Sequence, residues 1–358
     1  MTMHADSSLG RSQAGGRHTY GRRVHFKVGV VLALLAALCL SLVADIGYGP
    51  TQLSLTEVLQ AILSPNSVER TVRVVVWDMR LPMALMAVLC GAALALAGAQ
   101  MQTILDNPMA SPFTLGISAA ASFGASLGIA AGISLVPFVT AQVVPANAFV
   151  MAMLSAGVIH LLSVRRHVTR ETIILFGLAM VFIFNALLAI VQFFSSDQAV
   201  AAVVFWSLGS LTKSTWPKLG IVLLSLAIAV PFFACHAWKL TALRLGDQRA
   251  ASLGVKVARL RLYVLVMVSL LAACSVAAIG TIGFIGLIAP HLARLTVGED
   301  QRFFMPVAML CGGLILSLSS LLSRMILPGA IFPIGVITTL IGIPFFIALI
   351  MDRKRQAW

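Results

Sequence analysis

Charged side chains are scarce in this chain of 358 residues. Asp, Glu, Lys and Arg make up 10% of it, whereas a soluble domain carries about 25%. Hydrophobic residues make up 59%. They come in runs of roughly 17 to 25 residues, each long enough to cross a hydrocarbon core of about 30 Å. The sequence therefore predicts an all-α integral membrane protein and excludes an ordinary soluble domain.

Metal ligands and nucleotide-binding motifs are also missing. All five cysteines fall inside apolar runs and show neither metal-site spacing nor pairing in loops. No Gly-x-x-x-x-Gly-Lys-Ser/Thr motif occurs, so any ATP that drives this protein must be bound by a separate subunit. We expect no cofactor and no resident metal. A transition metal that crosses is expected to cross wrapped in an organic ligand, because the spans offer no clusters of ligands.

The apolar runs have no carboxylate near their middle. A proton-coupled carrier usually needs buried Asp, Glu or His relays, so a secondary transporter is disfavoured. Uptake that survives ATP depletion but collapses with the proton gradient would favour it. His160 and His291 are interpreted as packed or interfacial residues. An intramembrane enzyme is disfavoured too, because no paired nucleophile and base is found at helical spacing.

The net charge of +13 follows the positive-inside rule and does not indicate nucleic-acid binding. With ten spans and an inner N-terminus, 19 of the 25 Lys and Arg residues lie on the inner side. The apolar run 262–295 is too long for one span, and the glycines of IGTIGFIG divide it. A single span there would place Arg353, Lys354 and Arg355 outside. Ten spans with both termini cytoplasmic is therefore the better prediction.

The predicted organisation has three parts. A disordered cytoplasmic arm (1–27) precedes a transmembrane domain (28–351), and a cytoplasmic tail (352–358) ends the chain. The segment 195–218 is expected in the membrane interface, with Trp206 and Trp216 as aromatic anchors. The predicted spans are 28–44, 82–105, 113–136, 145–164, 172–194, 219–235, two within 262–295, 303–323 and 332–351.

One long polar stretch interrupts the apolar runs after the arm. Residues 240–261, within a predicted cytoplasmic loop 236–261, include five basic residues and one acidic residue. Gly246 and Gly254 divide the stretch, and leucines and alanines surround both glycines. This pattern predicts two short amphipathic helices with glycine joints. In a chain otherwise embedded in the membrane, such a loop is a surface that another protein can bind.

Small residues and fixed motifs follow one another in an order that helix packing alone does not explain. The motifs are Arg80-Leu81-Pro82, GAALALAGAQMQ (91–102), NPMASPFTLG (107–116), LGDQRAASLGV (245–255), GFIGLIAPHLAR (283–294), GEDQR (298–302), Ser323-Arg324 and PIGVITTLIGIPFF (333–346). In this order they resemble the FecCD/BtuC-type permeases of ABC importers, which carry ferric siderophores, haem or cobalamin. The resemblance covers most of the chain, from Arg80 to Phe346.

The resemblance implies a BtuC-like permease fold in the bacterial cytoplasmic (inner) membrane. Its expected partners are two cytoplasmic ATPase subunits, an extracytoplasmic substrate-binding protein and a second permease copy, identical or related. ATP-driven closure of the ATPases would move the polar loops, and rigid helices would pass the motion to the pathway. Ferric siderophore is the expected cargo because it is the commonest in the family, with haem and cobalamin as alternatives.

The resemblance also assigns roles to individual residues. Two departures from the family pattern, Met83 after the RLP motif and Ser320 four residues before Arg324, imply an outer docking surface with less charge than usual. The implied sets are Leu245, Gly246, Asp247, Arg249, Ala250, Leu253 and Gly254 for ATPase coupling; Arg80 and Arg324 for binding-protein docking; Gln100, Gln102, Asn107 and Pro108 for the translocation pathway; and Gly283, Gly286, Pro290, His291 and Arg294 as a structural motif.

Overall fold

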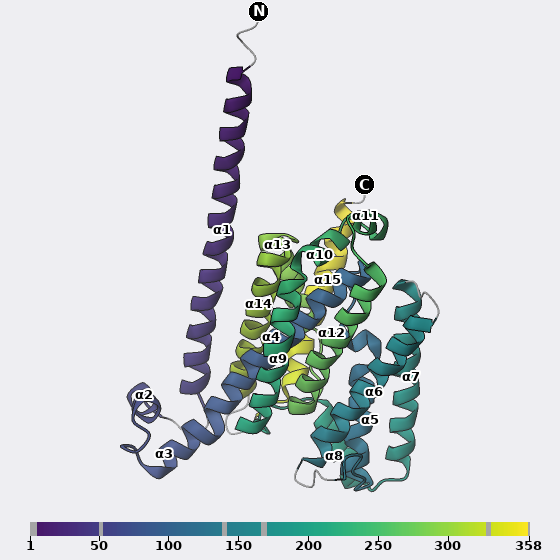
Figure 1. Ribbon diagram of the computed structural model, residues 1–358. Helices are drawn as coiled ribbons and strands as arrows, with labels where there is room; N and C mark the ends of the chain where they lie inside the picture. Colours follow the sequence, from purple (N-terminus) through teal and green to yellow (C-terminus); the bar gives the residue numbers. More distant parts are fainter. Residues whose placement is uncertain (1–5, 50–52, 138–141, 166–169, 327–330, 357–358) are drawn as a thin grey trace, which may run out of the picture.

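The computed structural model describes residues 6–49, 53–137, 142–165, 170–326 and 331–356, and these residues are helical or in connecting loops. The first helix, α1 (Asp6–Gly47), stands apart at its N-terminal end and packs along α14 nearer the membrane domain (Figure 1). The helix includes most of the arm that the sequence predicts to be disordered. Extending a helix that an apolar span has already nucleated costs little, which accounts for the difference.

The long helices of the rest of the chain run between the two ends of the molecule, and the short helices lie near those ends (Figure 1). Their bounds are α2 Leu55–Leu63, α3 Arg70–Val74, the π-helix η1 Val75–Arg80, α4 Leu81–Leu105, the 3₁₀-helix η2 Pro112–Leu115, α5 Ile117–Ala130, α6 Val143–Arg165, α7 Arg170–Phe193, α8 Asp197–Ser207, α9 Trp216–Cys235, α10 Ala237–Leu243, α11 Asp247–Ser252, α12 Val257–Ile279, α13 Ile285–Val297, α14 Gln301–Met325 and α15 Ile334–Gln356.

Each of the ten predicted spans coincides with a helix. Among the described residues, seven helices are long and apolar enough to cross a membrane. The third, eighth and tenth predicted spans correspond to shorter apolar helices, Ile117–Ala130, Ile285–Val297 and Ile334–Ala348. The predicted turn between the seventh and eighth spans is confirmed, because α12 ends at Ile279 and α13 begins at Ile285.

The helix α4 lies at the centre and is buried along almost its whole length. It packs against α14, α12 and α13, and glycines bring its backbone close to α14 and α13. A Cβ atom added to Gly91 would lie 2.3 Å from the Gly312 carbonyl oxygen of α14, and one on Gly98 would lie 1.9 Å from that of Gly286 in α13. Close backbone approach through small residues is the usual packing mode of membrane helices, and here it places α4 at the core.

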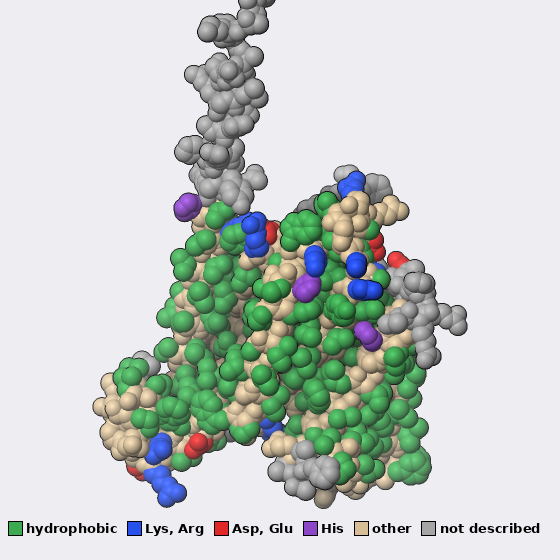
Figure 2. All heavy atoms as spheres, viewed as in Figure 1, with side chains coloured by type: hydrophobic (Ala, Val, Ile, Leu, Met, Phe, Trp, Pro, Cys, Tyr) green, Lys and Arg blue, Asp and Glu red, His purple; other side chains and the backbone are tan. Residues whose placement is uncertain are grey.

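Hydrophobic side chains cover the visible face of the molecule between its two ends. Lys and Arg side chains gather toward the upper end, where α10 and α11 lie (Figures 1 and 2).

The predicted interfacial segment, residues 195–218, contains α8. Trp206 is only 8% exposed, so it packs inside the protein and is not an interfacial anchor. Trp216 is 39% exposed, and its indole N–H donates to the Trp77 carbonyl oxygen at 3.1 Å.

Candidate functional site

The predicted pair of short helices is present as α10 and α11. Gly246 separates them with a φ of +94°, and Gly254 follows α11 with a φ of +82°. This backbone region suits glycine because it has no Cβ. A Cβ atom at either position would meet nothing within 4 Å. Backbone conformation, and not lack of space, therefore explains why glycine stands at both joints.

The α10–α11 loop presents a mixed apolar and basic surface. Leu245 is 54% exposed and Leu253 is 49% exposed, on either side of α11. Arg249 on α11 is also exposed, whereas Ala250 is fully buried and seats the helix on the protein. Two exposed leucines flanking an arginine form a surface suited to a protein partner, because apolar contact area and Arg both favour interfaces.

Asp247 takes part in a contact within the chain. Its carboxylate accepts hydrogen bonds from the Arg261 guanidinium at 3.0 and 3.2 Å. Arg261, which is 8% exposed, also donates to the Ile104 carbonyl oxygen at 3.1 Å. One arginine on α12 thus ties the start of α11 to the last turn of α4. Of the predicted coupling residues, Asp247 therefore positions the loop, and Arg249 is the exposed charge.

A second ionic group fixes the other side of the loop. Arg244 follows α10, and its guanidinium binds Glu299 in a two-pronged contact and Asp106 at 3.2 Å. Glu299 also pairs with Arg294 of α13, at 3.1 Å. Asp106 caps the C-terminus of α4 in the left-handed conformation, with a φ of +47°. The base of the α10–α11 loop is therefore bound to α4 and to the α13–α14 connection.

Gln100 and Gln102 contact neighbouring helices inside the protein. Both are fully buried on α4. Gln100 donates to the Gln301 side-chain oxygen at 3.0 Å, and Gln102 accepts from Arg294 at 3.1 Å. Their predicted place in the translocation pathway stays a prediction. They face α13 and α14 and form hydrogen bonds between helices, because a buried amide needs partners.

Asn107 and Pro108 lie in the turn that follows α4. The Asn107 side chain accepts a hydrogen bond from the Met109 backbone N–H at 2.9 Å, which is the contact of an Asx-turn. Both residues are half-buried at the same end of the molecule as Asp106. The structure assigns them a turn, and their predicted place in the pathway stays a prediction.

The motif 283–294 forms α13 and the residues before it. Gly286 packs against Gly98, and Arg294 joins the ionic group at the base of the loop. Pro290 lies inside the helix, and His291 packs edge-on against Phe345 of α15 with ring centroids 5.8 Å apart. Gly283 stands in the turn before α13, where a Cβ would meet nothing within 4 Å. The motif thus connects α4, α15 and the loop base.

Arg80 and Arg324 are buried, whereas the sequence places both at the outer surface, and their role in docking the binding protein stays a prediction. They are 4% and 6% exposed. Arg80 donates to the carbonyl oxygens of Ile46 and Gly47 at 3.0 Å each, and Arg324 donates to that of Tyr48 at 3.0 Å. Both guanidinium groups satisfy carbonyls that the end of α1 leaves without helical partners, where cations are favourable.

A buried carboxylate completes this second cluster. Asp45 of α1 is fully buried and forms an ion pair with Arg324. The residue four before Arg324, Ser320, also contacts its guanidinium, through the hydroxyl at 3.3 Å. Where the family pattern has an acidic residue on α14 itself, this chain supplies a carboxylate from α1. Sequence reasoning missed Asp45, because nothing in the local sequence shows that α1 ends beside α14.

Among the described residues, no group of three or more His, Cys, Asp or Glu side chains could hold a metal ion. The fold and this site define a polytopic membrane permease, with its exposed loop held rigidly at one end. The chain belongs to the FecCD transport family, whose model matches residues 26–352. Permeases of this family are the translocation subunits of ABC importers and act with separate ATPase subunits and a substrate-binding protein.

Individual relatives support this assignment over nearly the whole chain. The vitamin B12 import permease BtuC of Yersinia enterocolitica is 35% identical and covers 91% of this chain and 92% of its own. The hemin transport permease HmuU of Yersinia pestis is 35% identical, over 78% and 84%. A solved inward-facing structure of a metal-chelate type ABC transporter is 30% identical, covers 90% and 99%, and has a TM-score of 0.79.

The relatives are named for different cargoes. Besides vitamin B12 and hemin, they include the Fe(3+)-citrate permease YfmE of Bacillus subtilis and the molybdate permease MolB of Haemophilus influenzae, each 32% identical over 91% of this chain. These four relatives are almost equally similar to the chain, with identities of 32% to 35%. Membership of the family therefore fixes the type of transporter but leaves the cargo to be tested.

Proposed function

We propose that this chain is the permease of an ABC importer for a ferric siderophore. The observation that carries the transport assignment is the exposed α10–α11 loop, whose base is bound to α4 and α13 by two ionic groups. A rigid base allows force on an exposed loop to reach the membrane helices. Such coupling needs packed elements with discrete arrangements, and α4 is packed in this way.

The proposed contact with the ATPase uses Leu245, Arg249 and Leu253. These side chains are exposed, whereas Asp247 and Ala250 hold α11 in place. Reversing the charge of Arg249 should weaken docking by about 2–5 kcal/mol if its partner becomes buried. Arg259→Glu is the matched control, because Arg259 is exposed at the same end but lies on α12.

The choice of a chelated metal as cargo rests on the chemistry of the spans. Their described residues hold no cluster that could pass a bare transition-metal ion between ligands. An iron ion enclosed by a siderophore does not need such ligands. Haem and cobalamin are also enclosed metals and are the alternatives within the family.

The test is transport by proteoliposomes that contain the permease, its ATPase and its binding protein. We expect ATP-dependent uptake of radioactive ferric siderophore, with no effect of a proton uncoupler. Cobalamin, hemin and molybdate are offered in parallel. Uptake of one of these in place of the siderophore would overturn the assignment of the cargo. Uptake that needs the proton gradient but no ATP would overturn the assignment to ABC importers.

The coupling contact is tested separately by ATPase activity. Arg249→Glu should give a stable permease that no longer supports stimulated ATP hydrolysis or uptake, whereas Arg259→Glu should keep both. Normal uptake in Arg249→Glu would refute the assignment of the loop without affecting the cargo test.

A further inference from the structure

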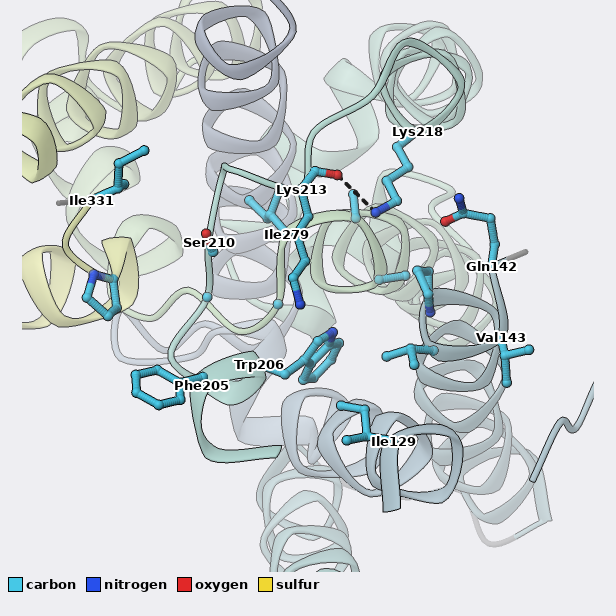
Figure 3. A pocket seen from close by; sticks show the side chains of 17 residues that line it. Ile129, Gln142, Val143, Phe205, Trp206, Ser210, Lys213, Lys218, Ile279 and Ile331 are labelled. Carbon is cyan, nitrogen blue, oxygen red and sulfur yellow. Dashed lines mark hydrogen bonds between the residues drawn. The ribbon is translucent and has the colours of Figure 1, made fainter. Parts of the chain in front are cut away.

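Two cavities adjoin one another at the end of the molecule opposite α10 and α11. The larger one, of about 650 Å³, lies where α6 and α9 begin and α12 ends. Its lining includes Trp206 and Ser210 together with two lysines, Lys213 and Lys218. Figure 3 shows both lysines at this pocket, with Lys213 near Trp206 and Lys218 near Gln142. Among the described residues that line it, none is acidic.

The two lysines have no carboxylate partner in the described part of the chain. Lys218 is half-buried and donates to the backbone carbonyl oxygen of Lys213 at 3.0 Å. Lys213 is exposed. Two ammonium groups on one short segment repel each other, so an anion bound between them is favoured. The larger cavity therefore has the charge of an anion site.

The smaller cavity, of about 440 Å³, continues from the first along the membrane-spanning helices. It runs between α6 and α9, both of which pack on α12, and its lining surface is almost entirely apolar. The two cavities share Lys218, Pro145 and Ala277 among their lining residues. An apolar groove thus leads directly away from the cationic pocket, and Ala146 and Ile221 line only the groove.

We infer that these cavities form one binding site for an anionic phospholipid. Its phosphate lies between Lys213 and Lys218, and one acyl chain lies in the groove between α6 and α9. The positive charge of the pocket complements the anionic headgroup, and the apolar groove complements the acyl chain of the lipid. Basic residues next to spanning helices recognise anionic lipids in this way. The site takes lipid from the leaflet at the α8 end, which is the outer leaflet in the proposed topology.

The test is native mass spectrometry of the purified full-length chain in detergent with equal amounts of phosphatidylglycerol and phosphatidylcholine. The wild type should retain phosphatidylglycerol in preference. Each lysine contributes roughly a fivefold preference, so Lys213→Gln with Lys218→Gln should lose about 30-fold. The matched control is Arg70→Gln with Arg73→Gln, an exposed basic pair on α3, also at this end, which should keep the preference.

The groove is tested by Ala146→Trp, which fills it and leaves both lysines in the sequence. This variant should elute from size-exclusion chromatography as the wild type does, and it should bind less of both lipids. Equal lipid preference in the lysine variant and the wild type would overturn the site, as would unchanged binding in Ala146→Trp. Inorganic phosphate is added alone in a further arm. If it raises the melting temperature while no lipid is retained, the pocket binds a soluble anion and the lipid assignment fails.

Discussion

At the scale of single residues, the pairing of Asp45 with Arg324 makes a sharp prediction. Both side chains are buried, so Asp45→Ala leaves a guanidinium without its carboxylate inside the protein. Breaking a buried pair typically costs about 3–5 kcal/mol. We expect a loss of this order in the free energy of unfolding, measured by denaturation in detergent.

The control for this loss is Asp300→Ala. Asp300 caps α14, is partly exposed and pairs with Arg302 at 2.8 Å. Removing such a cap costs about 1 kcal/mol. Equal losses in the two variants would mean that the buried pair contributes no more than an exposed one, and the structural role given to Arg324 would then be wrong.

At the scale of an element, α11 depends on the backbone at Gly254. Gly254→Val forces a branched residue into a left-handed conformation at a cost of about 1–2 kcal/mol, although the site has open space. The fold should survive, but α11 should be presented at a different angle. We expect stimulated ATP hydrolysis by the assembled transporter to fall at least several-fold.

Gly132→Val is the matched control for this strain. Gly132 has a φ of +66° and open space for a Cβ, and it lies in the connection after α5, at the opposite end from α11. It should lose similar stability and keep stimulated ATP hydrolysis. If both variants lose coupling equally, general destabilisation explains the effect and the joint has no special role.

The crossing of α4 with α13 gives a second prediction at this scale. Gly98→Ala would place a Cβ 1.9 Å from the Gly286 carbonyl oxygen, so the two helices must separate. Overpacking of this kind costs about 1–3 kcal/mol or more. We expect a lower yield of folded protein on size-exclusion chromatography. Gly157→Ala on α6, where a Cβ would meet nothing within 4 Å, should elute as the wild type does.

At the scale of the whole molecule, the distribution of basic residues predicts its orientation. We expect a cysteine at 249, in a cysteine-free background, to be protected from an impermeant thiol reagent in intact spheroplasts. A cysteine at 213 should be labelled. Both positions are exposed in the structure, so protein burial does not complicate the comparison. Labelling at 249 without labelling at 213 would invert the topology and reject the cytoplasmic assignment of the loop.

The sequence predicted the helices well and their contacts poorly. Apolar runs and glycines locate spans because length and hydropathy are local properties, and α10 and α11 were found in the same way. The burial of Arg80 and Arg324 and the partner of Gln100 were not predicted. The partners of Arg80, Gln100 and Arg324 lie 34, 201 and 279 positions away, and a single sequence gives no information on which segments meet at such separations.

The same separations bear on how the protein is made. Helix α4 enters the membrane early, yet Gln100 binds Gln301 and Gln102 binds Arg294, which follow 201 and 192 residues later. At about 5–20 residues per second, a ribosome needs roughly 10–40 s to supply them. During that interval α4 is held in the bilayer by its apolar side chains, before Gln301 and Arg294 have been synthesised. Biogenesis of the central helix therefore depends on its hydrophobicity, and its hydrogen bonds form only after most of the chain has been synthesised.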